Sequence, residues 1–249
     1  IAYDWMPTFT EVAGYMGPVR SDGVSLLPRL TGEEDKNESS IYVEYFHGNR
    51  TPGYPEFLEK HRNRERKQMQ MIRIGDTLGI RYDIQSPYDN FEIYHITEDP
   101  QQSNNLNGAS QLGELDKRFK EKITQMRMPN ATAPRPYDNV LVASKKGKSE
   151  KKGWNTQFYN SDTPWISAPK DKITTRLETL DLENMEEKSA LFEAYLHVPE
   201  SGSYTFNLKA EGKAFLRLHD IAVIDEDYKF EGNLKTATLN LERGFHPMT

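Results

Sequence analysis

Short β-prone runs dominate the second half of the chain. From Trp154 onward they recur about every ten residues and are separated by Pro, Gly, Asp or Asn. The runs are residues 190–197, 203–209, 213–219, 221–225 and 236–241. Short strands at this spacing are typical of a β-sandwich, in which each strand gives alternate side chains to a shared core. The last residues, GFHPMT, stop where we expect a further strand to begin, so the sequence predicts an all-β sandwich that is cut short.

The first half shows a different pattern, in which β-prone runs are followed by one helix. The runs are residues 41–46, 69–74, 78–84 and 91–96, and Gly75-Asp76-Thr77 has the composition of a hairpin turn. Residues 111–127 carry apolar side chains three or four positions apart, at Leu112, Leu115, Phe119, Ile123 and Met126. With Ser110 as N-cap and Pro129 at its end, this helix would cover one face of an antiparallel meander. The first half is therefore predicted to be α+β.

The segment before the meander is predicted to begin with a short helix. In residues 4–14 apolar side chains lie at helical spacing, Asp4 can cap the start, and Gly14 can end the helix. The residues that follow contain Gly and Pro and read as a loop that packs Leu26, Leu27 and Leu30.

Composition changes again between the two halves. Residues 129–153 are first rich in Pro and then rich in Lys, which is typical of a linker, although the Lys run could instead contact a polyanion. We therefore expect a first domain over residues 1–128, a linker over residues 129–153 and a sandwich over residues 154–249.

Charge and cysteine content exclude several classes of function. The net charge of -6 provides no basic field for nucleic acid or an anionic membrane. No apolar run approaches the roughly 20 residues that a membrane helix needs. The chain has no Cys, which excludes disulfides, thiolate metal sites and a Cys nucleophile.

Two blocks of sequence carry a resemblance over residues 4–127. The first is DWMPTFTEVAGY followed by DGVSLLPRLTGE, and the second is IRIGDTLGIRYD followed by FEIYHITEDPQQSNNL. Together they resemble the C-terminal part of the alkaline-phosphatase-like sulfatases. Three positions depart from that family's pattern: Thr77 stands for a Lys, His95 for an Asp and Gln102 for a Glu.

The resemblance implies a parent enzyme that hydrolyses sulfate esters on carbohydrate, using formylglycine and Ca²⁺. The family's nucleophile motif, C/S-x-P-x-R, does not occur in this chain. We therefore assign no catalytic residue and no metal ligand here, and expect both cofactors in a missing catalytic domain that would be the main partner. By itself the chain would be inactive, and it would shape the substrate cleft and stabilise the enzyme. The family also implies a periplasmic or extracellular location.

The segment after residues 41–46 holds the candidate substrate-binding residues. In sulfatases this region can lie at the rim of the active-site cleft, and Arg and His bind sulfated sugars well. We therefore expect His47, Arg50 and Tyr54 to face the substrate, with an ordinary solvated loop as the alternative. The basic run at residues 61–67 could contact a sulfated polysaccharide or form a solvated helix face.

The second half resembles PA14-type modules. The residues that carry this resemblance lie in LFEAYLHVPESGSYTFNLKAEGKAFLRLHDIAVID and LNLERGFHP. Sugar-binding members use two adjacent aspartates to hold Ca²⁺, whereas this chain has Ala210-Glu211-Gly212, so a calcium-dependent lectin site is not expected.

Two other functions stay open at the level of the sequence. One is a non-catalytic carbohydrate-binding or adhesion module, and the other is a phosphodiesterase or phosphomutase of the same superfamily. If a catalytic domain normally covers the first helix, an exposed apolar patch is expected around Met6, Phe9 and Leu26.

Overall fold

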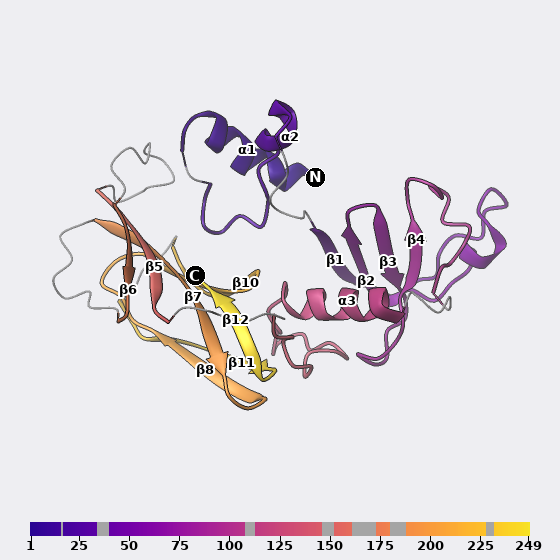
Figure 1. The fold of residues 1–249 in the computed structure, drawn as a ribbon. Helices are drawn as coiled ribbons and strands as arrows, with labels where there is room; N and C mark the ends of the chain where they lie inside the picture. Colours follow the sequence, from indigo (N-terminus) through magenta and orange to yellow (C-terminus); the bar gives the residue numbers. More distant parts are fainter. Residues whose placement is uncertain are drawn as a thin grey trace. The chain divides into compact units, whose positions relative to one another are not determined.

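The computed structural model describes residues 1–15, 17–33, 40–107, 113–145, 152–160, 173–179, 188–227 and 232–249 (Figure 1). The chain forms two compact units, one of Ile1–Asn37 with Leu141–Thr249 and one of Glu38–Val140. The elements are a few helices and mostly antiparallel strands, which confirms the predicted fold class. No helix in the described ranges is both long and apolar enough to cross a membrane.

The unit of residues 38–140 is built on the predicted four-stranded meander. Its strands are β1 (Ser40–His47), β2 (Lys67–Ile74), β3 (Thr77–Arg81) and β4 (Glu92–His95), and they pair antiparallel in sequence order. The turn between β2 and β3 lies at Gly75, whose φ of 57° is in the left-handed region that glycine adopts without strain. The hairpin prediction is therefore confirmed.

The predicted covering helix is α3 (Gly113–Thr124), which lies along the meander (Figure 1). Phe119 and Ile123 are buried and join a core with Ile72, Phe91 and Ile93. Gly79 on β3 lies under Phe119, since a Cβ at that position would be 2.6 Å from the ring. The glycine therefore lets the helix approach the sheet. The predicted N-cap Ser110 and the stripe residue Leu112 lie outside the described residues.

A polar cluster lies on the same side of the sheet, and we call it the Glu44 cluster. Glu44 Oε2 accepts hydrogen bonds from the hydroxyls of Tyr42 at 2.6 Å and Tyr137 at 2.8 Å, and lies 3.2 Å from Arg127 Nε. Arg127 also pairs with Asp138 at 2.6 Å, and both side chains are almost buried. Burial by itself raises the pKa of Glu44, but these donors and the Arg127 charge together lower it.

Residues of the predicted 129–153 linker lie in both units. Tyr137 and Asp138 belong to the Glu44 cluster. Val142 is buried in the core of the other unit and forms a parallel bridge with Leu241, and the backbone N–H of Lys145 donates to Phe245 O at 2.8 Å. The limits proposed from composition stay a prediction.

The N-terminal segment contains a 3₁₀ turn, η1 (Ala2–Asp4), then α1 (Trp5–Val12) and α2 (Leu27–Thr31). The expectation that Asp4 caps α1 is wrong, because its side chain makes no cap hydrogen bond. Its carboxylate instead accepts the backbone N–H of Val24 at 3.0 Å, and Thr8 Oγ1 accepts that of Leu26 at 2.8 Å. Both side chains are buried and tie α1 to the segment that follows. Gly23 is required there, since a Cβ would come within 2.2 Å of Tyr3 O.

The ends of these helices partly match the prediction. Gly14 follows α1 with a φ of 79°, as expected of a residue that ends a helix. The predicted loop instead contains α2, and Leu30 in it is 65% exposed rather than packed.

One face of α1 is exposed and apolar, and we call it the α1 apolar face. It consists of Trp5, Met6, Phe9 and Val12, all of them exposed, with the rings of Trp5 and Phe9 stacked at 5.4 Å. Met6 and Phe9 are thus exposed as expected, whereas Leu26 is half-buried.

The second half folds into β strands, as its spacing predicts. They are β5 (Trp154–Tyr159), β6 (Ile173–Leu177), β7 (Ser189–Val198), β8 (Gly202–Leu208), β9 (Ala214–Leu218), β10 (Ile221–Glu226), β11 (Lys235–Leu241) and β12 (Gly244–Met248). One sheet has the order β10-β9-β12-β7-β5-β6, and β11 pairs with β8. Val198, Leu218, Ile221, Leu239 and Leu241 are almost fully buried between them. Residues Gly244–Met248 of the GFHPMT segment are themselves a strand, β12, which lies between β7 and β9, and the expected truncation of the sandwich stays a prediction.

A pair of histidines connects β12 to the turn after β9, and we call it the His246 pair. His246 is fully buried, and its Nε2 lies 2.8 Å from Glu242 O. Because a carbonyl only accepts, Nε2 carries the proton and Nδ1 is left to accept. His219 Nε2 lies 2.8 Å from that Nδ1 and donates to it. Burial is the main reason why the pKa of His246 is lowered.

Candidate functional site

The candidate site is the long connection between β1 and β2, residues 47–66, which we call the 47–66 loop. Its base is closed by Thr51, whose backbone N–H donates to Arg64 O at 2.9 Å. The Thr51 hydroxyl donates to His61 O at 2.6 Å and accepts the backbone N–H of Arg64 at 2.9 Å. These three hydrogen bonds hold the two ends of the loop together.

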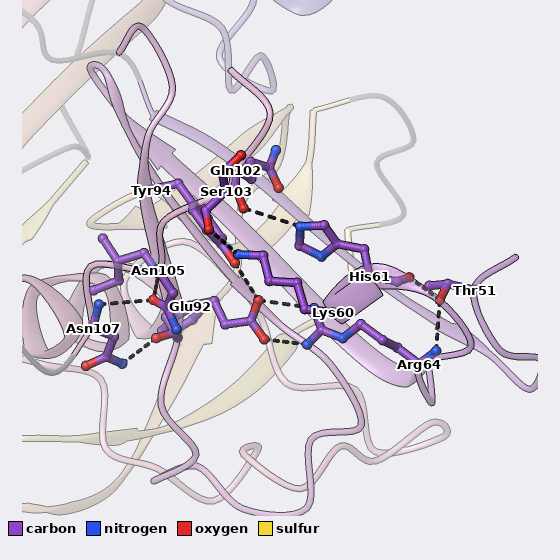
Figure 2. A network of polar contacts seen from close by, with 12 residues as sticks. Thr51, Lys60, His61, Arg64, Glu92, Tyr94, Gln102, Ser103, Asn105 and Asn107 are labelled. Carbon is purple, nitrogen blue, oxygen red and sulfur yellow. Dashed lines mark hydrogen bonds and ion pairs between the residues drawn. The ribbon is translucent and has the colours of Figure 1, made fainter. Parts of the chain in front are cut away.

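The loop is tied to the sheet by an ion pair (Figure 2). The Arg64 guanidinium binds both carboxylate oxygens of Glu92 on β4, one of them at 3.1 Å, and lies over the ring of Tyr82. The Tyr94 hydroxyl donates to Glu92 Oε2 at 2.8 Å. Burial disfavours the Glu92 carboxylate, but the hydrogen bonds from Arg64 and Tyr94 outweigh it and lower its pKa. Glu92 therefore stays ionised and keeps the loop in place.

A second set of contacts joins the loop to the turn after β4 (Figure 2). Lys60 Nζ donates to Ser103 O at 2.9 Å, and His61 Nε2 lies 3.3 Å from Gln102 O. The turn is itself ordered by Asp99, whose carboxylate accepts the backbone N–H groups of Ser103 and Asn104. The loop thus rests on a turn that is ordered by its own hydrogen bonds.

The same turn explains two residues of the second sequence block. Asn105 Oδ1 accepts the backbone N–H of Ile93 at 2.9 Å, and the N–H of Leu106 donates to Ile93 O at 2.8 Å. β4 is the edge strand of the meander, so these bonds satisfy backbone groups that no further strand pairs. The block therefore encodes a covered sheet edge.

The tip of the loop carries two exposed aromatic rings. Tyr54 is 59% exposed and Phe57 is 43% exposed, and their ring centroids lie 5.7 Å apart at 59°. Arg62 holds the backbone beneath them, because its guanidinium donates to Phe57 O at 2.7 Å and to Pro55 O. Arg62 therefore fixes the backbone of the tip, while the two aromatic rings remain exposed to solvent.

The three predicted substrate-binding residues lie on or next to this loop, in different surroundings. His47 ends β1, and its Nδ1 accepts the backbone N–H of Asn49 at 3.1 Å. Arg50 pairs with Glu65, with 2.7 Å between Nε and Oε1, and remains largely exposed. Tyr54 lies at the tip. Their role in substrate binding stays a prediction.

The cationic side chains of the basic run, residues 61–67, make contacts with other residues of this chain. Beyond the contacts of His61, Arg62 and Arg64, the Arg66 guanidinium lies 5.4 Å from the centre of the Tyr45 ring, and Lys67 pairs with Asp83 at 3.3 Å. Of this run only His61 is in a helix, the 3₁₀ turn η2 (Glu59–His61), so the helix-face interpretation is wrong. Its cations position the loop.

The loop presents exposed aromatic and basic side chains to solvent. Within the described residues, no three or more His, Asp or Glu side chains are grouped so that they could hold a metal ion.

The contributions of Phe57 and Arg62 to the tip of the loop were not predicted from the sequence. Two prolines and a glycine around Tyr54 were the available signal that the tip adopts a fixed shape.

Family comparison gives two matches that cover most of the chain. Residues 1–129 match the family described as N-sulphoglucosamine sulphohydrolase, C-terminal, and residues 151–244 match the PA14 domain. No curated protein matches the chain.

Several solved structures show partial likeness. One is a protein in complex with its substrate D-glucosamine-2-N,6-O-disulfate, with 26% identity and a TM-score of 0.34 over 49% of this chain and 23% of that one. Another is a 2-O GAG sulfatase, with 20% identity and a TM-score of 0.33 over 48% of this chain and 23% of that one. A β-glucosidase from Kluyveromyces marxianus in complex with glucose has 18% identity and a TM-score of 0.30 over 51% of this chain and 15% of that one.

These TM-scores are too low to establish a shared fold, and the chain spans only about a quarter of the length of the first two proteins. The family match is the stronger finding, because it includes 129 of the 249 residues and both sequence blocks. The chain belongs to the family of N-sulphoglucosamine sulphohydrolase C-terminal domains, and a PA14 domain follows that region.

Proposed function

We propose that this chain is the C-terminal part of a sulfatase that hydrolyses sulfate esters of a carbohydrate, and that the 47–66 loop forms part of the rim of the substrate cleft. The observation that carries the proposal is the family match over residues 1–129. The braced loop supports it, because a rim must hold its side chains in fixed positions to contribute to binding. One of the partly similar proteins was solved in complex with its substrate D-glucosamine-2-N,6-O-disulfate, which is a sulfated sugar.

The roles of the individual residues follow from their surroundings. The Arg50 guanidinium is held on one side by Glu65 and is otherwise exposed, so it can offer its remaining N–H donors to a sulfate oxygen. His47 keeps its Nε2 for a ligand, because Nδ1 accepts from Asn49. Tyr54 offers a ring face and a hydroxyl.

The chemical step would belong to another part of the enzyme. Formylglycine would supply the nucleophile there and Ca²⁺ would stabilise the charge that develops on the sulfate. The side chains described here do not group into a calcium site, so they would contribute to binding and orientation only. Such an enzyme would work in the periplasm or outside the cell.

The PA14 domain would support the enzyme or separate it from a surface. The position at which sugar-binding members carry two aspartates lies in the turn between β8 and β9, where Glu211 is exposed and flanked by Ala210 and Gly212. A single carboxylate is a poor site for Ca²⁺, which prefers six to eight oxygen ligands.

Two measurements test the proposal. The reading frame upstream of the Ile1 codon should carry C/S-x-P-x-R, and a start codon directly before Ile1 would contradict a sulfatase.

In the enzyme that contains both parts, Arg50→Ala should raise KM for the sulfated sugar roughly tenfold with little change in kcat, because a rim residue contributes similar binding energy to the ground state and the transition state. Arg73→Ala, on the β2–β3 hairpin, is the matched control. An unchanged KM in Arg50→Ala would remove this residue from the rim.

A further inference from the structure

The tip of the 47–66 loop holds an aromatic pair whose exposure calls for a physical reason. Tyr54 and Phe57 are tilted against each other at 5.7 Å and together leave two ring surfaces open to solvent. Exposing apolar rings is unfavourable in water by roughly 25 cal/mol for each Å². Aromatic side chains are enriched at binding surfaces, and this exposed pair lies on an ordered loop, so it is a candidate binding surface.

The backbone that carries the rings is fixed before any ligand arrives. Arg62 binds the carbonyls of Pro55 and Phe57 from below. Gly53 packs directly against Asn63, since a Cβ at Gly53 would lie 2.8 Å from Asn63 Oδ1. Asn63 has a φ of 53°, a left-handed backbone conformation that Asn adopts more readily than most residues. Binding at the tip would thus cost little ordering entropy.

The surroundings of the pair indicate the size and polarity of its ligand. The α1 apolar face is a continuous surface of four apolar side chains, which suits another protein surface. Tyr54 and Phe57 instead form a patch of only two rings, with Pro55 and Glu56 between them in the sequence, and the same loop carries the Arg50–Glu65 ion pair. A small ligand with an apolar face and a rim of hydroxyl groups fits these surroundings better than a protein does.

A pyranose ring has this character. Its axial C–H bonds form a slightly positive apolar face, which is attracted to the negative face of an aromatic ring, and its hydroxyls bind carboxylates and guanidinium groups. We propose that Tyr54 and Phe57 form a stacking subsite for a pyranose ring, and that this subsite recognises the ring itself rather than the sulfate. The proposal deepens the proposed function and rests on it for the substrate class.

The test measures weak sugar binding to the full chain by saturation-transfer NMR. The two ligands are D-glucosamine-2-N,6-O-disulfate and unsulfated D-glucosamine, each titrated in the millimolar range. We expect transfer to the ring C–H protons of both sugars with dissociation constants within about threefold of each other. Tyr54→Ala and Phe57→Ala should each weaken binding roughly fivefold, because an aromatic contact is worth about 1 kcal/mol.

Three controls keep the result interpretable. Tyr88→Ala removes a tyrosine that is 83% exposed elsewhere in the same unit, and Phe9→Ala removes a ring of the α1 apolar face; both should bind as the parent chain does. Tyr54→Phe should retain binding, which separates ring stacking from loss of the loop. Circular dichroism of each variant verifies folding.

The outcomes separate this inference from the proposed function. Binding that requires the sulfates, or that is unchanged in both Tyr54→Ala and Phe57→Ala, would overturn the stacking subsite. Absence of transfer to either sugar would overturn it as well and would favour a protein surface over the tip. A frame without C/S-x-P-x-R would instead refute the sulfatase, and would leave a measured ring-stacking site in a non-catalytic carbohydrate-binding module.

Discussion

The Glu44 cluster and the His246 pair both hold an ionisable side chain inside the protein. The first stabilises the charged form of its side chain, whereas the second stabilises the neutral form. Glu44 accepts two tyrosine hydroxyls and faces a cation, so its environment stabilises the charged form. His246 is fully buried with one backbone acceptor and one neighbouring ring, so its environment stabilises the neutral form. The difference shows that burial alone does not set a pKa, and that the supply of donors and opposite charges decides its direction.

The two sites nevertheless respond to acid in the same sense. For His246 the folded pKa is lowered, so its contribution to stability is complete above the ordinary value of 6.5 and is lost as pH falls through the folded pKa. For Glu44 the folded pKa is also lowered, so its contribution is complete above 4.5 and is lost as pH falls further. As the pH falls, the contribution of His246 to stability should therefore be lost before that of Glu44.

The largest effect is expected from breaking the charge balance of the Glu44 cluster. Arg127→Met leaves Glu44 and Asp138 without their shared cation, and should lower the free energy of unfolding by about 3 kcal/mol. Urea unfolding followed by circular dichroism measures this. Lys117→Met is the control, because Lys117 is exposed and its ion pair with Glu121 spans 3.9 Å. A loss for Arg127→Met as small as that of the control would show that the cluster contributes no charge stabilisation.

The second effect is the order in which the two units respond to acid. Between pH 7 and pH 5 the amide protection factors, corrected for the intrinsic exchange rate at each pH, should fall in β7 and β12, while those of β2 and β3 hold until the pH falls below about 4.5. Each unit by which a folded pKa is lowered corresponds to about 1.4 kcal/mol. Simultaneous loss of protection in both sheets would contradict separate titrations.

The smallest effect is expected in the dependence of folding stability on pH in one variant. His246→Gln keeps an amide donor for Glu242 O but has no group that titrates near neutrality. Its stability should therefore vary less between pH 7 and pH 5 than that of the parent chain. A parallel pH dependence in the two proteins, measured by urea unfolding at each pH, would assign the effect to another group.

Periodicity predicted the strands and the covering helix well, because local patterns decide them. Alternation in residues 69–74 and the glycine at position 75 are sufficient to specify the β2–β3 hairpin. Periodicity gave a wrong prediction where a segment distant in the sequence determines the conformation or contacts of a residue. Asp4 has the composition of an N-cap, yet its carboxylate is used by Val24, 20 residues away. β12 contains Gly244 and Pro247, which disfavour strands, yet pairing with β7 makes it one.

The candidate site shows the same limit. The sequence placed His47, Arg50 and Tyr54 in one region, and the structure shows how that region is held. The braces could not be predicted, because Arg64 reaches Glu92 across 28 residues and Lys60 reaches Ser103 across 43. Register between distant segments, rather than composition, determines these pairs.

The stacked Trp5 and Phe9 on α1 also give the protein an optical reporter. Trp5 is 45% exposed, so its indole emission should lie near the red end of the range for folded proteins. Any surface that covers this helix would exclude water from the indole and move the emission to shorter wavelength. Association with the catalytic domain proposed above could therefore be followed in a fluorimeter without attaching a dye.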